Sequence, residues 1–171
     1  IAIHMHRLYR LMLAPRFPFV TALLVGVAMV TFGVILAQLL RLAACPLCIL
    51  QRMLYLSMAL WAAIGLLVYN FPIWRRLAAL LMAASSATGV FVAGYQTYIQ
   101  RFAQDTQCSN QVAWWETLVD RAGELAPLLF YASGLCSDPA WKFIGLSIAE
   151  WSLVTFCMLT LISLRALLQR P

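Results

Sequence analysis

The chain has 171 residues, of which 64% are hydrophobic and only 11% are charged, with a mean hydropathy of +0.86. An ordinary soluble domain is about 45–50% apolar and about 25% charged, so this composition excludes a soluble globule. The six acidic residues and eight glycines are also too few for a disordered tail or a collagen-like fibre.

Four apolar runs are long enough to cross a bilayer as helices, which needs about 20 residues each. We place them at about 18–40, 49–71, 77–99 and 144–164, with a long loop at about 100–143. Within this loop, Trp115, Leu118 and Val119 have helical spacing, which predicts a short helix that either lies on the membrane surface or caps the bundle. The sequence therefore predicts one all-α membrane domain over 1–171, a bundle of four transmembrane helices.

The basic residues are concentrated before the first run, in the Pro72–Arg76 turn and after the last run, whereas all six acids lie at or after Asp105. This distribution follows the positive-inside rule and predicts that both termini face the cytoplasm. The net charge of +6 is accounted for in this way and indicates no nucleic-acid partner. A lipoprotein box at Leu42–Cys45 or a cleaved signal peptide is disfavoured, because the first apolar run is too long.

Four of the five cysteines fall on the outer side of this topology. Cys45 and Cys48 form a C-P-L-C motif at the start of the second run, and Cys108 and Cys136 lie in the long loop. Two structural disulfides could explain them, whereas a zinc site is disfavoured by the wide spacing of the loop pair, so no metal is expected. A bridge across two residues closes almost no loop, and such pairs are typically redox-active. Cys157 in the fourth run is expected to pack as a small apolar residue.

The start of the second helix favours a reactive Cys48. Pro46 suits the first helical turn, which places Cys48 near the positive end of the helix dipole. Arg52 lies one turn further along the same face and would favour the thiolate, although it could instead snorkel to the interface. The chain has no haem-type, Rossmann or metal-cluster motif, so the sequence predicts a lipid-soluble acceptor, a quinone, and no flavin.

Two motifs identify a family resemblance. The segments C-P-L-C-I-L-Q-R (Cys45–Arg52) and A-S-G-L-C-S-D-P-A-W-K-F-I-G-L (Ala132–Leu146) occur in this order, and the chain resembles the DsbB family. Members are bacterial inner-membrane proteins that reoxidise the periplasmic thiol oxidase DsbA and pass the electrons to a quinone, either ubiquinone or menaquinone. The resemblance implies a protein-disulfide:quinone oxidoreductase with its redox cysteines on the periplasmic side.

The resemblance also implies a role for each cysteine. Cys108, paired with Cys136, is expected to be attacked by the reduced DsbA-like partner. Cys45 then exchanges with Cys136, and Cys48 is released as a thiolate that reduces the quinone. Arg52 is expected to stabilise this charge.

Gln51 and Gln96 depart from the family pattern, which commonly has an acidic residue and a histidine at these positions. Gln96 could donate to a quinone carbonyl or form an interhelical hydrogen bond. Two alternative functions remain, a non-enzymatic scaffold stapled by disulfides and an enzyme of the vitamin K epoxide reductase type. The second is disfavoured because its active C-x-x-C belongs with the last helix of the bundle.

Overall fold

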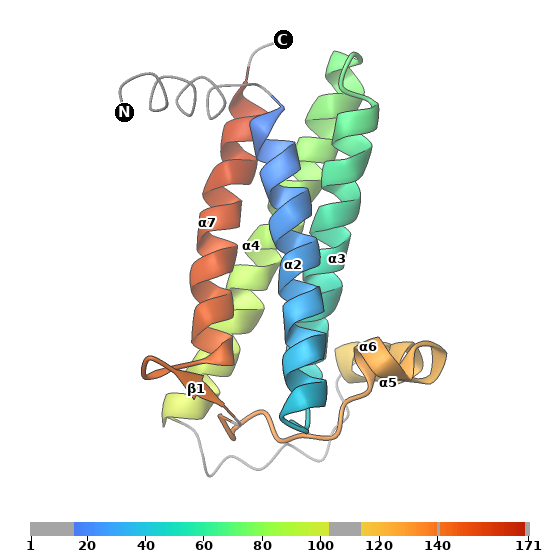
Figure 1. Cartoon of the computed structure of the whole chain (residues 1–171). Coiled ribbons are helices and arrows are strands. Elements are labelled where there is room, and N and C mark those ends of the chain that lie inside the picture. Colours follow the sequence, from blue (N-terminus) through green and yellow to red (C-terminus); the bar gives the residue numbers. More distant parts are fainter. Residues whose placement is uncertain (1–15, 103–113, 140, 170–171) are drawn as a thin grey trace.

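The computed structural model describes residues 16–102, 114–139 and 141–169. Four long helices run side by side (Figure 1): α2 (Phe17–Leu39), α3 (Pro46–Leu67), α4 (Pro72–Phe102) and α7 (Ile148–Leu168). Each is long and apolar enough to cross a membrane. Helix α2 contacts α3, α3 contacts α4, α4 contacts α7, and α7 contacts α2 again. The predicted all-α, four-helix membrane bundle is confirmed.

The helix boundaries differ from the predicted spans by several residues. Helix α3 begins at Pro46 rather than at residue 49, so the C-P-L-C motif forms its cap and first turn. The segment Pro72–Arg76, predicted as a turn, is the start of α4, because proline suits the first position of a helix. Helix α7 begins at Ile148 rather than at residue 144, since the preceding residues form a hairpin.

The long loop contains more regular structure than the sequence predicted. Helices α5 (Trp114–Leu125) and α6 (Pro127–Phe130) lie beside the end of the bundle where α3 begins (Figure 1). The predicted short helix is thus present and extends beyond Val119. Strands β1 (Lys142–Phe143) and β2 (Leu146–Ser147) pair across a two-residue turn with positive φ at Ile144 and Gly145.

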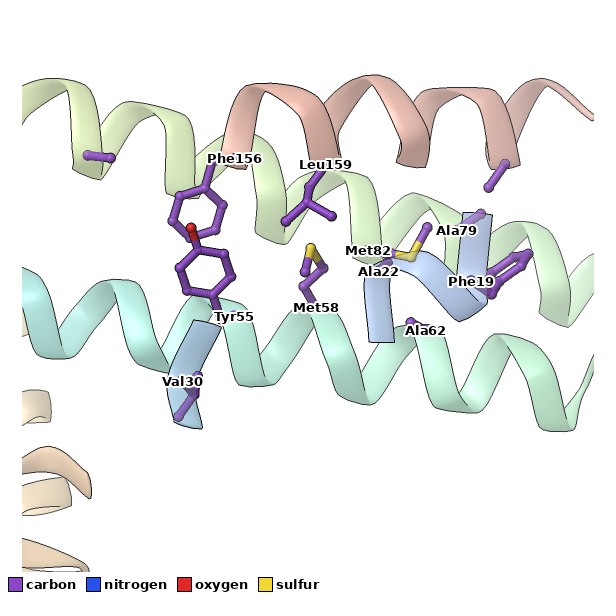
Figure 2. Close-up of a cluster of buried hydrophobic side chains, with 12 residues drawn as sticks. Phe19, Ala22, Val30, Tyr55, Met58, Ala62, Ala79, Met82, Phe156 and Leu159 are labelled. Atoms are coloured by element: carbon purple, nitrogen blue, oxygen red, sulfur yellow. The ribbon is translucent and has the colours of Figure 1, made fainter. Parts of the chain in front are cut away.

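The core of the bundle is built from interleaved aromatic, methionine and small side chains (Figure 2). The rings of Tyr55 and Phe156 stack at 4.0 Å between α3 and α7, and Met58 and Leu159 follow along the same interface. Within a membrane, such close approach of helices depends on small residues at the contacts. Cys157, beside Phe156 in the chain, is exposed on the outer face of α7. The prediction that it packs as a small apolar residue is therefore not supported by its exposed position.

Gly89 is one of these small contact residues, and we expect Gly89→Ala to destabilise the bundle. A Cβ at this position would overlap the ring of Phe156. Overpacking of this kind costs about 1–3 kcal/mol, which exceeds the gain from replacing a helical glycine. Gly94→Ala is the matched control, because its Cβ would meet only Leu153 at 3.9 Å. Thermal unfolding in detergent should show a lower Tm for Gly89→Ala alone, and equal Tm values would contradict the packing argument.

Candidate active site

The first turn of α3 brings Cys45 and Cys48 together. Cys45 caps the helix in an extended conformation (φ −83°, ψ 160°), and its sulfur accepts a hydrogen bond of 3.4 Å from the backbone N–H of Cys48. The Cys45 thiol in turn donates to the Cys48 sulfur at 3.1 Å. Pro46 occupies the start of the helix, where a missing N–H has no consequence. The two sulfurs are therefore held within reach of disulfide formation.

The loop after α6 returns to this turn and carries Cys136. The backbone N–H groups of Ser133 and Gly134 donate to the carbonyl of Ala44 at 2.9 and 3.0 Å. A Cβ on Gly134 would overlap the carbonyl oxygen of Ala43, so only glycine allows this approach. Cys136 consequently packs against Cys45 and hydrogen-bonds with it. Cys108 lies outside the described residues.

The sulfurs of Cys45 and Cys136 differ in pKa. Hydrogen bonding to Cys136 is the main cause that raises the pKa of Cys45, because its proton is held between two neighbouring sulfurs. The same bond lowers the pKa of Cys136, whose sulfur also accepts from the backbone N–H of Leu47. Hydrogen bonds to a thiolate favour the charged form. Cys136 therefore loses its proton at a lower pH than Cys45.

We expect fully reduced protein to react with iodoacetamide at Cys136 at a lower pH than at Cys45. Only the thiolate is nucleophilic, so a lowered pKa moves the reaction curve to lower pH and a raised pKa moves it higher. Mass-spectrometric mapping of the alkylated peptides over a pH series measures both curves. Cys45→Ala, which removes the thiol donor, should shift the Cys136 curve upward. Coincident curves for the two cysteines would contradict this assignment.

Two glutamine side chains form a buried hydrogen-bond chain that ends on the sulfurs. Gln51 Nε2 in α3 donates to Gln96 Oε1 in α4 at 2.7 Å. Gln96 Nε2 donates to the sulfurs of Cys45 and Cys48 at 3.2 and 3.1 Å. Gln51 orients the second amide so that its N–H groups point at the cysteines. Of the two roles considered for Gln96, the structure shows the interhelical hydrogen bond, with the sulfurs as its acceptors.

Arg52 lies one turn after Cys48 and connects three parts of the site. Its Nη1 donates to the carbonyl of Leu129 in α6 at 2.9 Å, and its Nη2 donates to the carbonyl of Gly33 in α2 at 3.1 Å. The side chain therefore binds inside the protein and does not snorkel away. No carboxylate of the described residues forms an ion pair with this guanidinium. The sequence did not indicate that the carbonyls of Gly33 and Leu129 would bind Arg52.

A cavity of about 560 Å³ lies beside the cysteines. Its walls come from all four long helices and from the returning loop, and they are mostly apolar. Cys48, Arg52 and Gln96 contribute polar groups to the lining, and Met29, Phe32 and Leu36 of α2 form part of the apolar wall. Pockets of this size and character are typical of small-molecule sites. The described residues contain no cluster of His, Cys, Asp and Glu able to hold a metal ion.

Glu150 belongs to a structural network instead of the cysteine site. It forms a capping box with Ser147 at the start of α7, with hydrogen bonds of 2.7 and 3.3 Å, and an ion pair with Arg101. Ser147 also donates to Gln100 at 2.8 Å. This network holds the start of α7 against the end of α4.

A four-helix membrane bundle with three neighbouring cysteine sulfurs at one end of a spanning helix defines a membrane thiol–disulfide oxidoreductase. The particular family follows from comparison with known proteins. The family model for disulfide bond formation protein DsbB matches residues 15–166. This chain therefore belongs to the DsbB family.

The curated relatives carry the same name. Disulfide bond formation protein B of Dechloromonas aromatica is 39% identical over 133 residues, covering 75% of this chain and 77% of the relative. The protein of Nitrosospira multiformis is 35% identical over 132 residues, covering 76% and 77%. That of Nitrosomonas europaea is 30% identical over 159 residues, covering 86% and 90%.

Proposed function

We propose that this protein reoxidises a periplasmic DsbA-like thiol oxidase and passes the electrons through its two cysteine pairs to a membrane quinone. The observation that carries the proposal is the position of the Cys45 sulfur, which contacts both Cys48 and Cys136. A sulfur between two others can exchange one disulfide for another with little movement. A scaffold stapled by two separate disulfides would not need this contact.

The exchange begins at the loop pair in its disulfide form. A thiolate of the reduced partner attacks Cys108, forms a mixed disulfide and releases Cys136 as a thiolate. The lowered pKa of Cys136 favours this departure. Cys136 then attacks Cys45 in the Cys45–Cys48 disulfide, so that a Cys45–Cys136 bond forms and the electron pair of the broken bond moves to Cys48.

The second half of the cycle regenerates both pairs. The second partner cysteine attacks the mixed disulfide and releases Cys108, which attacks Cys136 and frees Cys45. The bound quinone supplies an acceptor for two electrons and two protons. Cys48 delivers the electrons, and the Cys45–Cys48 disulfide is restored. The net reaction converts the partner's dithiol and a quinone into a partner disulfide and a quinol.

The cavity beside Cys48 fits the head group of a quinone. Cys48 and Arg52 are among its lining residues, and the apolar wall from α2 suits a ring and the start of an isoprenoid tail. Arg52 is held by the carbonyls of Gly33 and Leu129, so its charge is fixed at the site. A fixed positive charge stabilises the thiolate that leaves during exchange.

Quinone reduction by the purified protein tests the proposal. The protein is supplied with a reduced DsbA-like thiol protein, and native chain is compared with Cys48→Ser and Cys108→Ser. Turnover in native protein that both substitutions abolish is the expected result. Absence of quinone reduction in native protein, with its disulfides resistant to mild reductant, would support a structural scaffold instead.

The proposed orientation places the cysteine end of the bundle in the periplasm and both termini in the cytoplasm of a bacterial inner membrane. The basic residues Arg16, Arg75 and Arg76 at the opposite end support it. A membrane-impermeant thiol reagent added to sealed spheroplasts should modify a Trp114→Cys variant and not a Trp74→Cys variant, because these exposed positions lie at opposite ends. The reverse labelling pattern would contradict the orientation.

A further inference from the structure

The end of the bundle opposite the cysteines holds a cluster of charge that the redox chemistry does not use. Arg16 caps the start of α2, Tyr69 lies in the turn between α3 and α4, and Arg75 lies in the first turn of α4. Figure 1 shows the start of α2 and this turn at the same end of the bundle. The guanidinium carbons of Arg16 and Arg75 lie 4.7 and 5.2 Å from the centroid of the Tyr69 ring. One aromatic ring thus gathers two positive charges.

Arg75 has a donor with no acceptor. Its Nη2 is buried and is the one buried side-chain nitrogen or oxygen in the described part of the chain without a hydrogen-bond partner. A buried donor of a charged group is strongly penalised when it is unpaired, and more so at the edge of a membrane. Arg75 Nη2 can therefore donate a hydrogen bond to an anionic acceptor.

The side-chain carboxylates in the described part of the chain do not supply this acceptor. The acidic residues that the structure describes lie in the loop between α4 and α7 or at the start of α7, at the cysteine end: Glu116, Asp120, Glu124, Asp138 and Glu150. The two guanidinium groups that contact the Tyr69 ring carry the same charge, so neither neutralises the other. An anion bound by both would offset this charge and satisfy Nη2.

We propose that Arg16, Tyr69 and Arg75 bind the phosphate of an anionic glycerophospholipid. Arginine presents several donors in a planar fork that suits phosphate oxygens. Phe71 and Leu77 flank Arg75 in the chain with exposed fractions of 61% and 42%, and they offer apolar surface to acyl chains. This combination of charge and neighbouring apolar surface fits a lipid better than a free phosphate ion. Basic pockets between transmembrane helices bind anionic lipid head groups in this manner.

The test compares thermal unfolding of the full chain in phosphatidylcholine nanodiscs with and without about one quarter phosphatidylglycerol. Phosphatidylglycerol should raise the Tm of native protein, and native mass spectrometry should retain a phosphatidylglycerol adduct. Arg75→Gln should remove most of this rise and weaken the adduct about tenfold, the loss expected for a hydrogen bond to a charged group. In phosphatidylcholine alone Arg75→Gln should have nearly the native Tm, because it removes both the unpaired buried Nη2 donor and the contact with the Tyr69 ring.

Arg76→Gln is the matched control, since it removes the same charge from the next, exposed position. Arg76→Gln should show the same rise in Tm with phosphatidylglycerol as native protein. Equal losses of this rise in Arg75→Gln and Arg76→Gln would indicate a diffuse charge effect and overturn the proposal. Full lipid binding by Arg75→Gln would overturn it too. Arg16→Gln supplies a second variant, and it should also weaken the adduct. Inorganic phosphate is added to native protein in phosphatidylcholine nanodiscs as a further control. If it raises the Tm as much as phosphatidylglycerol does, the assignment to a lipid is overturned. These readouts are independent of quinone reduction.

Discussion

Cys45→Ser is expected to abolish quinone reduction, because the Cys45 sulfur is the only route between the two cysteine pairs in the proposed exchange. It contacts Cys48 at 3.1 Å and hydrogen-bonds with Cys136. A serine hydroxyl occupies nearly the same space but forms no disulfide. The variant should therefore fold normally and still form a mixed disulfide between Cys108 and the partner. Steady-state quinone reduction with a reduced DsbA-like partner measures the effect.

Cys157→Ser is the matched control for this substitution. Cys157 is exposed on the outer face of α7, and the proposed mechanism gives it no role. The control should turn over at the native rate. Residual turnover in Cys45→Ser above the background would contradict the relay, because electrons would then reach the quinone without Cys45.

Gln96→Leu is expected to lower the rate of quinone reduction by about ten- to a hundredfold, since a hydrogen bond to a charged group contributes about 1.5–3 kcal/mol. Gln96 Nε2 donates to both sulfurs of the C-P-L-C motif, and such donors would stabilise Cys48 as the thiolate of the proposed exchange. Leucine has a similar volume and donates nothing. The loss should appear in kcat, with KM for the partner unchanged, because we propose that the partner docks on the loop and not on α4.

Two further variants separate this positioning role from packing. Gln96→His keeps an N–H donor and should recover part of the rate, with a new pH dependence near the ordinary pKa of histidine at about 6.5. Gln51→Leu should have a smaller effect, because Gln51 acts by orienting Gln96 at 2.7 Å. A native rate in Gln96→Leu, or a loss that Gln96→His fails to rescue at any pH, would contradict the role.

The bundle could be predicted from the sequence because membrane spans follow from hydropathy alone. An apolar run of sufficient length must be helical in lipid, where every backbone hydrogen bond has to be internal. The ends of the helices were less certain, because composition near an interface does not distinguish a helix start from a tight turn. The hairpin before Ile148 depends on positive φ at Ile144, which the residue type disfavours and the sequence does not signal.

The site was predictable in its residues and not in its geometry. The first two turns of α3 and its N-cap contain Cys45, Cys48 and Arg52. Their spacing along one helix therefore predicts that they lie on the same face. The approach of Cys136 to Cys45 depends on backbone hydrogen bonds to Ala44 and on the missing side chain of Gly134, which are tertiary features. The hydrogen bond between Gln51 and Gln96 likewise joins residues in different helices.

The most direct test of the central claim is a time-resolved map of the disulfides during one turnover. Native protein is mixed with an equivalent of reduced DsbA-like partner and a quinone, quenched with acid at intervals, and digested for mass spectrometry without reduction. We predict that a peptide pair joined by Cys45–Cys136 appears before the quinol and disappears as both original pairs are restored. Detection of Cys45–Cys48 and Cys108–Cys136 alone at every interval, while quinol accumulates, would contradict a relay between the two pairs.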